Sequence, residues 1–441
     1  MLSQPEAQRL VDRVLALARA TKGASALVAV TGEREGNTRF AVSEITSSGD
    51  VERLTISLTV QFGQRSASAT TNQLDDRSID DLVGRVVRMA RLAPENPEQM
   101  APLGRQRYLA VKGAVDPATA KLTPDVRAKA VGSAIAAADA AKVSIAGFVR
   151  HGQHARTLGT TEGLSAYHAW TSSAFSCTAR TADGTGSGWA GLGSHRMADL
   201  DAEALAKVAV DKATSSARPH KLEPGRYTVI LEPAAVTSLL RFLVSSLGAR
   251  RADEGRSFFA KKPPGTKLFP ETITLRSDPT DGPLGASPFD DEGFSLAPVH
   301  WIDKGSLTAL TYSRYWAKKQ GKQPTGAPGG WTLDGGTASR DELLKGVKRG
   351  VLITRFWYLR ALDPQSILIT GLTRDGTYLI EDGAITSAVN NFRFNESPVQ
   401  MLAHCDGLGA AAIPSGGETG GMRVPVLRTH EFNLASISEA I

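Results

Sequence analysis

A strictly alternating segment before residue 63 constrains the fold most strongly. In "ERLTISLTVQF", apolar residues alternate with polar ones from Leu54 to Phe62, which predicts a β-strand buried on one face only. Such a strand needs a second layer over its apolar face. Helical patterns before and after this segment in the sequence can supply that layer. Residues 4–22 place apolar side chains on one helical face, and a second helix is predicted to begin with Ser78 as its N-cap.

Further helices and strands complete the first half. The pair Thr123-Pro124 predicts a third helix, with an N-cap followed by proline at N1, and "DAEALAKVAVDKATSS" predicts a fourth. Strands are expected near "VSIAGFVRHG" and "SAFSCTARTAD". The segment "ARPHKLEPGRYTVILEP" then indicates a linker that leads into a new strand. We therefore expect an α+β domain over residues 1–220.

The second half, residues 221–441, is rich in strand-like, glycine and proline segments. Asp382-Gly383 lies between two strand-like runs and is a strong hairpin signal. A related turn is expected at Asp303-Lys304-Gly305. These patterns predict a mainly antiparallel β domain with a few helices. The fold class expected for the whole chain is α+β, in two domains.

Length and charge narrow the functional classes. A chain of 441 residues fits two or three domains. The net charge of +6 is spread out, and no run of Lys and Arg is long enough to form a nucleic-acid groove, so nucleic-acid binding is not expected. No apolar run approaches the roughly 20 residues that cross a bilayer. The first 20 residues lack an uninterrupted apolar core, and two distant cysteines suit a reducing compartment, which together predict a cytoplasmic protein.

Histidines and cysteines are the first candidates for chemistry. His151 and His154 form an HxxH pair, with His168 further along. The surrounding segment is turn-like and has no nearby carboxylate, so we interpret them as exposed loop histidines, with a metal site as the alternative. His404 and Cys405 are adjacent. A thiolate nucleophile or metal ligand there stands as an alternative to a half-buried thiol.

The acidic triplet Asp290-Asp291-Glu292 could offer oxygen ligands to Ca²⁺ or Mg²⁺, but it lacks the alternate spacing of a calcium loop. We favour a turn in which an aspartate caps backbone N–H groups. The chain has no GxSxG elbow and no Walker loop.

Ordered motifs in both halves resemble one family. They are "NTRFAVSEITSS", "RLAPENPE", "FDDEGF", "TGLTRDGTYLIEDG", "NNFRFNESP" and "RVPVLRTHEFN". This succession is similar to the TldD/PmbA (TldE) family, and "GGMRVPVLR" favours its PmbA/TldE branch. The resemblance implies a two-domain subunit and a dimer that encloses a cavity. It also implies association with a cytoplasmic zinc metallopeptidase that cuts unfolded or small peptides.

The catalytic members, called TldD, carry HExxxH on a helix after a strand, and a distant cysteine supplies a further zinc ligand. If "LEPAAVTSLL" corresponds to the start of that helix, the first histidine falls on Arg241, the glutamate on Phe242 and the second histidine on Ser246. Arginine has no lone pair for a metal, phenylalanine has no proton to exchange, and serine is a poor zinc ligand. The context of Cys405, "AHCDGLG", also departs from the family's cysteine motif. We therefore expect no catalytic residue, metal or cofactor in this chain, with zinc in a TldD-type partner.

The leading hypothesis is a non-catalytic, PmbA/TldE-like subunit that forms a heterodimer with a TldD-type catalytic subunit and helps to bind peptide; whether it forms a homodimer when alone is left open. Strands can hold an extended peptide at a sheet edge. The candidate contact residues are Arg374, Asp375, Asn391, Arg393 and Asn395. The alternation of Arg393 and Asn395 with phenylalanines equally fits the solvent face of a strand.

Two alternatives stay open. One is a stand-alone peptidase or hydrolase with an unrecognised site, built from His404, Cys405 and the acidic residues near 290. The other is a regulatory binding protein, because some members of this family are labelled modulators of DNA gyrase.

Overall fold

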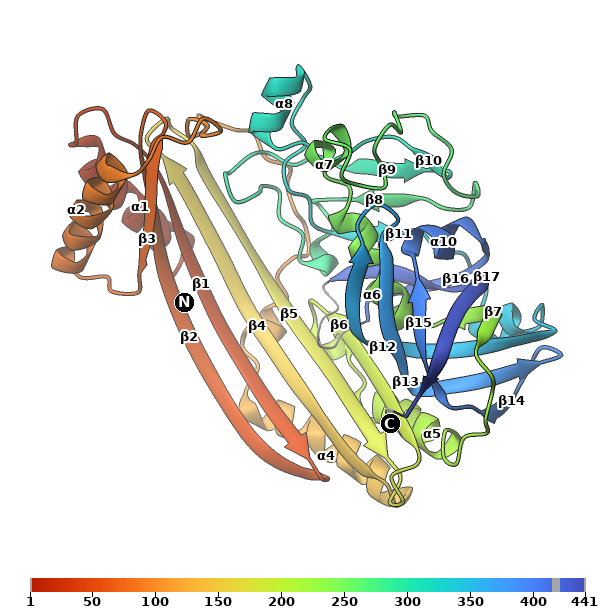
Figure 1. The fold of residues 1–441 in the computed structure, drawn as a ribbon. Coiled ribbons are helices and arrows are strands. Elements are labelled where there is room, and N and C mark those ends of the chain that lie inside the picture. Colours follow the sequence, from red (N-terminus) through yellow and green to blue (C-terminus); the bar gives the residue numbers. More distant parts are fainter. Residues whose placement is uncertain (1, 415–420, 440–441) are drawn as a thin grey trace.

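The computed structural model describes residues 2–414 and 421–439. It contains two β-sheets with helices packed on them, so the predicted α+β class is confirmed (Figure 1). We call the sheet built from residues 25–194 the first sheet and the sheet built from residues 225–438 the second sheet.

The first sheet has six antiparallel strands in the order β3-β2-β1-β4-β5-β6. Their bounds are β1 Ser25–Ala41, β2 Glu44–Phe62, β3 Arg65–Thr71, β4 Ser144–Thr160, β5 Ser165–Arg180 and β6 Ser187–Ser194. The alternating segment that ends at Phe62 forms the last part of β2, as predicted, and Ile56, Leu58 and Val60 are fully buried. Figure 1 shows these strands as a long, curved layer.

Helices cover one face of the first sheet. Those of the first half are α1 Gln4–Arg19, α2 Asp76–Leu92, α3 Pro117–Ala120, α4 Pro124–Ala140, the 3-10 turn η1 Met197–Asp199 and α5 Ala202–Ser215. Apolar residues of α1 and α2 pack against Val28 and Val30 of β1, and those of α4 and α5 pack near Phe40 of the same strand. Val28, Val30 and Phe40 are separated by even numbers of positions along β1, so their side chains point to the same face of the sheet. All four helices therefore lie on that face.

The beginning of α2 differs from the prediction. Asp75, and not Ser78, is its N-cap, and the Asp75 carboxylate accepts a hydrogen bond of 3.0 Å from the Ser78 backbone N–H. Ser78 is therefore the third residue of the helix. The Asp75 carboxylate, three positions earlier in the chain, caps the helix instead of the Ser78 hydroxyl.

The second sheet has eleven strands. Nine follow the order β10-β9-β8-β11-β17-β15-β13-β12-β7, while β14 pairs with β13 and β16 pairs with β17. Their bounds are β7 Gly225–Leu231, β8 Leu275–Ser277, β9 Val299–Asp303, β10 Ser306–Leu307, β11 Trp331–Leu333, β12 Arg349–Asp363, β13 Leu368–Glu381, β14 Ala384–Ala388, β15 Asn391–Glu396, β16 Cys405–Ala412 and β17 Met422–Ser438. The pairs β7–β12 and β11–β17 are parallel, and the other neighbours are antiparallel.

Both predicted turns of the second half are present. Asp382 and Gly383 join β13 to β14 with φ values of 46° and 80°, and Lys304 and Gly305 join β9 to β10 with 46° and 76°. Two successive positive φ values are typical of a type I′ hairpin turn, which explains the preference for glycine at the second position.

Short helices pack around the second sheet: α6 Pro233–Ser245, α7 Ala249–Asp253, the 3-10 turn η2 Gly282–Leu284, α8 Arg314–Gln320, α9 Arg340–Leu344 and α10 Pro398–Ala403. The largest apolar cluster of the chain includes Leu239, Leu240, Leu243 and Leu247, which are fully buried. The helix α6 is thus part of the core. Within the described residues, no helix has the length and apolar character needed to cross a bilayer.

Candidate functional site

The helix α6 follows the strand β7, whose last three residues are buried. The family resemblance implies the same order of strand and helix for the zinc helix. Arg241 and Phe242 are half-buried, and the Arg241 guanidinium carbon lies 4.9 Å from the centre of the Phe242 ring. The Ser246 hydroxyl donates a hydrogen bond of 2.7 Å to the backbone carbonyl of Phe242. At all three positions, the side chain therefore interacts with its own helix.

The donor set does not fit zinc. None of Arg241, Phe242 and Ser246 is a side chain that binds zinc in proteins. Across residues 2–414 and 421–439, no group of three or more His, Cys, Asp or Glu side chains is arranged to hold a metal ion.

His404 and Cys405 do not form a nucleophilic pair. His404 is the exposed C-cap of α10, and Cys405 begins β16 with 3% of its surface exposed. The thiol is therefore more deeply buried than expected, and it donates to the Gly407 carbonyl at 3.6 Å. Burial raises the pKa of Cys405 to about 11, which leaves a protonated thiol at neutral pH.

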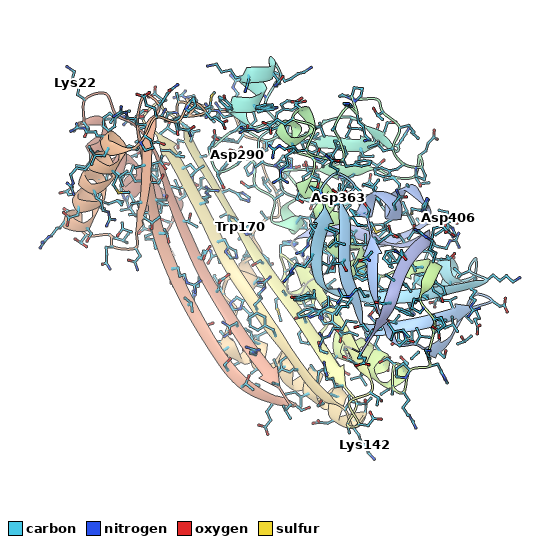
Figure 2. All side chains as sticks on the ribbon, in the orientation of Figure 1. Lys22, Lys142, Trp170, Asp290, Asp363 and Asp406 are labelled. Atoms are coloured by element: carbon cyan, nitrogen blue, oxygen red, sulfur yellow. The ribbon has the colours of Figure 1, made fainter. Side chains whose placement is uncertain are left out.

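The expectation of exposed loop histidines is wrong. His151 and His154 lie inside β4 and His168 lies inside β5, with 6%, 9% and 5% of their surfaces exposed. His154 and His168 both stack on Trp170, with ring centres 5.0 Å and 5.3 Å away. Burial lowers the pKa of all three histidines. Figure 2 shows Trp170 on the face of the first sheet that looks toward the second sheet.

The acidic triplet forms the capped turn that its pattern favours. The Asp290 carboxylate accepts hydrogen bonds from the backbone N–H groups of Glu292 and Phe294, both at 3.0 Å. The other two acids pair with arginines, Asp291 with Arg156 at 2.5 Å and Glu292 with Arg314 at 2.7 Å. The Arg156 pair connects the first sheet to the second half of the chain.

Two of the five predicted contact residues, Arg374 and Asp375, line a cavity between the sheets. The cavity has a volume of about 360 Å³. Its lining residues are Ser176, Thr178, Arg180 and Trp189 from the first sheet and Arg355, Trp357, Arg374 and Asp375 from the second. The cavity thus lies at the junction of two sheets, a common location for ligand sites.

Asp375 organises the polar groups of this cavity. Its side chain is 2% exposed and accepts hydrogen bonds from the Ser187 hydroxyl at 2.5 Å and from Arg355 Nη1 at 3.0 Å. Arg374 Nε lies 3.9 Å from the same carboxylate. The indole of Trp357 stands next to both arginines, whose guanidinium carbons are 5.2 Å and 5.1 Å from its ring centre.

An irregularity in the ladder directs these side chains into the cavity. The register between β12 and β13 shifts between Ile353 and Arg355, and Asp375 adopts a left-handed φ of 57° before Gly376 at 126°. The Thr354 hydroxyl holds the Asp375 carbonyl at 3.0 Å. Bulges and left-handed residues other than glycine cost energy and are frequent near functional sites.

The other three predicted contacts do not line this cavity. Asn391 accepts hydrogen bonds from the hydroxyls of Thr373 and Thr377 and lines a neighbouring cavity of about 240 Å³, whose lining also includes Asp375. Arg393 is exposed, and the Asn395 backbone carbonyl accepts from Asn433. Arg393 and Asn395 thus match the alternative interpretation, the outer face of a strand.

Sequence reasoning missed the aromatic part of the cavity. Trp189, Arg355 and Trp357 were not among the candidates, although "RFWYLR" from Arg355 to Arg360 is unusually dense in aromatic and cationic residues. That density is the sequence signal that could have found Arg355 and Trp357.

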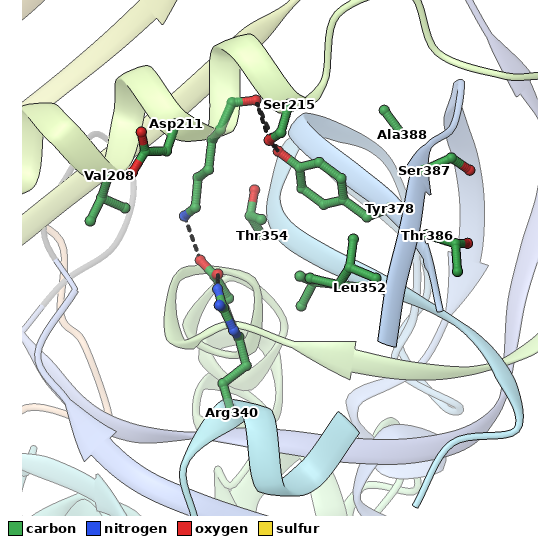
Figure 3. A pocket seen from close by; sticks show the side chains of 13 residues that line it. Val208, Asp211, Ser215, Arg340, Leu352, Thr354, Tyr378, Thr386, Ser387 and Ala388 are labelled. Atoms are coloured by element: carbon green, nitrogen blue, oxygen red, sulfur yellow. Dashed lines mark hydrogen bonds and ion pairs between the residues drawn. The ribbon is translucent and has the colours of Figure 1, made fainter. Parts of the chain in front are cut away.

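A third cavity, of about 470 Å³, lies where α5 meets the second sheet (Figure 3). Lys212 Nζ donates to Glu232 at 2.6 Å, and Arg340 Nη1 lies 3.3 Å from the same carboxylate. The Tyr378 hydroxyl donates to the Lys212 carbonyl at 2.9 Å, and burial raises the pKa of this phenol to about 12. Because these groups bind one another, we interpret this cavity as a structural junction.

Residues 118–217 match the PmbA/TldA metallopeptidase central domain, and residues 224–436 match the PmbA/TldA metallopeptidase C-terminal domain. The chain belongs to the PmbA/TldD metallopeptidase family. Its matching segments begin before α4 and end within β17.

Two curated proteins are similar to this chain over part of their length. A protein named "Metalloprotease" from Methanothermobacter thermautotrophicus is 27% identical over 230 residues, which cover 48% of each chain. A "Metalloprotease PmbA homolog" from Buchnera aphidicola is 27% identical over 166 residues, or 36% of this chain and 37% of the relative. The chain therefore spans about half or less of these relatives.

Solved structures share the fold over nearly the full chain. TldE from Thermococcus kodakarensis has a TM-score of 0.86 at 16% identity and covers 97% of this chain and 99% of its own. A putative modulator of a DNA gyrase from Thermotoga maritima has a TM-score of 0.86 at 19% identity, covering 97% and 100%. One from Bacteroides thetaiotaomicron has 0.85 at 20%, covering 99% and 100%. At such identities the likeness concerns the fold alone.

Proposed function

We propose that this chain is a non-catalytic, TldE-like subunit of a cytoplasmic PmbA/TldD-type peptidase complex. The observation that supports this most is the chemistry of α6. In the place where the family resemblance puts HExxxH, the helix carries Arg241, Phe242 and Ser246, while its leucines remain packed in the core. The helix keeps its structural role and lacks side chains for metal or proton transfer.

In this proposal a TldD-type chain supplies the zinc and the general base. The present chain would form a heterodimer with it and contribute part of the surface that binds unfolded or small peptides. The cavity between the two sheets supports a role in peptide binding, because strands on both sides present polar and aromatic side chains to it.

Zinc analysis and a peptidase assay test this proposal together. The purified chain is assayed for zinc per protomer and for cleavage of an unstructured peptide, alone and after addition of a TldD-type subunit. We expect no stoichiometric zinc and no cleavage by the chain alone, with cleavage once the partner is added. Near-stoichiometric zinc together with cleavage by the chain alone would overturn the proposal.

The stand-alone hydrolase has weaker support. Cys405 is buried and protonated at neutral pH. Figure 2 shows Asp290 and Asp406, which follows Cys405, on different sides of the second half of the chain. The proposed acidic residues and the thiol are therefore separated in the fold.

A further inference from the structure

The strand β12 exposes two neighbouring aromatic side chains. Trp357 is 40% exposed and Tyr358 is 56% exposed, whereas large apolar side chains are usually buried. The preceding residue, Phe356, lies in the core with 3% of its surface exposed. The two exposed rings therefore do not belong to the core, and they are available for contact with another molecule.

A bulge turns these rings toward solvent. The register between β12 and β13 shifts between Trp357 and Arg360, and Tyr358 has a left-handed φ of 55°. This conformation is uncommon for an aromatic residue and costs energy. Bulges redirect side chains and are frequent near functional sites.

Arginines on the same side of the sheet surround the rings. Trp357 pairs directly with Leu372 of β13, and Leu372 pairs with Arg393 of β15, so the three side chains point to one side. Arg360 points to that side too, because it pairs with Thr370, two positions from Leu372. We call this side of the three strands the aromatic surface, which is formed by Trp357, Tyr358, Arg360, Leu372 and Arg393.

The two arginines of the aromatic surface are not engaged by acids. Within the part of the chain that the structure describes, Arg360 donates to a backbone carbonyl at 2.8 Å and Arg393 to the Thr370 hydroxyl at 3.4 Å, and neither forms an ion pair. The acid at the end of β12, Asp363, accepts hydrogen bonds from the turn that follows it. The surface thus offers two cations to a negatively charged group.

We infer that the aromatic surface binds peptides through a large apolar side chain that packs on Trp357, with a nearby carboxylate on Arg393. The inference rests on the proposed peptide-binding function and adds the substrate class to it. Neighbouring strands lie about 4.8 Å apart, so Arg393, two strands from Trp357, is about 10 Å away. An extended peptide rises about 3.3 Å per residue, which puts the carboxylate about three residues from the apolar side chain.

A peptide suits this surface better than a nucleic acid does. Trp357 also lines the cavity between the two sheets, so the aromatic surface continues the cavity that supports peptide binding. Nucleic-acid bases stack on open aromatic faces. Here the guanidinium of Arg360 lies over the Tyr358 ring at 4.4 Å, and that of Arg374 over the Trp357 ring at 5.1 Å. An apolar side chain can pack against the exposed ring edges instead.

A second copy of the chain is a less suitable ligand. Stable protein interfaces use about 20 to 30 residues on each side. The aromatic surface offers three apolar side chains, those of Trp357, Tyr358 and Leu372, which match a single side chain of a peptide.

Fluorescence anisotropy with three labelled peptides tests the inference on the full chain. All share one unstructured, C-terminally amidated sequence. The first has one phenylalanine and, three residues later, one glutamate; the second has serine in place of phenylalanine, and the third has glutamine in place of glutamate. We expect the second to bind at least about tenfold more weakly than the first, because it lacks the apolar ring. The third should bind about threefold more weakly, because an exposed ion pair contributes little.

Variants connect these preferences to the aromatic surface. Trp357→Ser should weaken binding of the first peptide about tenfold and leave the second unchanged; Tyr358→Ser serves the same purpose if Trp357→Ser does not fold. Leu92→Ser, at an 86% exposed position of α2, is the matched control and should change neither. Arg393→Gln should weaken the first peptide about threefold and leave the third unchanged, whereas Arg349→Gln, at an exposed position of β12, should have no effect. Circular dichroism and thermal melting check that each variant is folded.

Several results would overturn the inference. These are equal binding of the first and second peptides, no binding of any peptide, or equal effects of Trp357→Ser and Leu92→Ser. A single-stranded oligonucleotide that loses affinity in Trp357→Ser, or a homodimer that this variant dissociates, would also overturn it. Failure of the proposed function would show instead as zinc and cleavage in the chain alone. The two failures are therefore distinguishable.

Discussion

The guanidinium of Arg241 lies over the ring of Phe242, its neighbour on α6, at a distance of 4.9 Å. A cationic group and an apolar ring thus interact at two positions where a zinc helix would need a ligand and a general base. The contact is compatible with a half-buried helix surface. It is not compatible with metal binding.

The first prediction concerns Arg241. Arg241→Gln should leave the zinc content of the chain unchanged and alter peptide cleavage by the complex with a TldD-type subunit by less than about twofold, because the side chain takes no part in the reaction. Cleavage is followed with a labelled unstructured peptide. A loss of tenfold or more, with assembly of the complex intact, would contradict the assignment of α6 as structural.

The second prediction concerns the ion pair Lys212–Glu232 between α5 and the segment after β7. Its side chains are 11% and 15% exposed and 2.6 Å apart. We expect Glu232→Gln to lower the free energy of unfolding by about 3 kcal/mol, because it leaves the Lys212 ammonium half-buried without its carboxylate. Lys212→Met should cost less, because Arg340 still pairs with Glu232 at 3.3 Å, and the double variant should cost less than the sum of the two. Urea unfolding of the four proteins measures the coupling.

A matched control for this cycle lies on the same helix. Glu203 and Lys207 of α5 are also 2.6 Å apart but 55% and 62% exposed. Their coupling should be at most about 0.5 kcal/mol. Equal coupling energies for the two pairs would show that burial is not the cause.

The third prediction concerns Gly36 of β1. A Cβ atom added there would collide with the side chains of Arg127, His151 and Asp50. Arg127 is fully buried and pairs with Asp50 at 2.9 Å, so it has little room to move. Gly36→Ala should therefore lower the free energy of unfolding by about 2–3 kcal/mol. Gly49→Ala on β2, which enters open space, should change it by less than about 0.5 kcal/mol.

The fourth prediction concerns pH. Burial lowers the pKa of His154 below its usual 6.5, a shift that Glu33 and Glu35 partly oppose and Arg150 reinforces. Below pH 6.5 the unfolded chain therefore takes up a proton that the folded chain does not. The stability that the chain has with neutral His154 is fully present above pH 6.5. As the pH falls below 6.5, the free energy of unfolding decreases by up to about 1.4 kcal/mol per pH unit.

The comparison of two glutamine variants measures this effect. His154→Gln should reduce the slope of unfolding free energy against pH between 6.5 and 5. His300→Gln, at an exposed position of β9, should leave the slope unchanged. Identical slopes for the wild-type chain and His154→Gln would refute the prediction.

Local patterns predicted the parts of the fold that depend on neighbouring residues. The alternation that ends at Phe62 specifies a strand with one buried face, and Asp382-Gly383 specifies a hairpin, because each signal is complete within a few residues. The buried leucines of α6 were predictable for the same reason.

Long-range packing accounts for what the sequence did not predict. The segment around His151 and His154 contains glycines and polar residues, which favour a turn locally. The sheet pairs it on both sides, with β1 and β5, and this pairing overrides the local preference. The cavity between the two sheets could not be predicted for a similar reason. Trp189 and Arg355 are far apart in the chain and meet only after both sheets have formed.

The pairing of β17 has a consequence for the order in which the chain folds. This strand, Met422–Ser438, contacts β7, β11, β15 and β16. During synthesis, β7 leaves the ribosome nearly two hundred residues before β17, which is one of its two pairing partners, the other being β12. The first sheet can form while translation continues, but the second sheet cannot close until β17 has emerged. In a cell, nascent chains would thus expose the apolar residues of the second sheet until synthesis is almost finished, and that interval is when chaperones would be needed most.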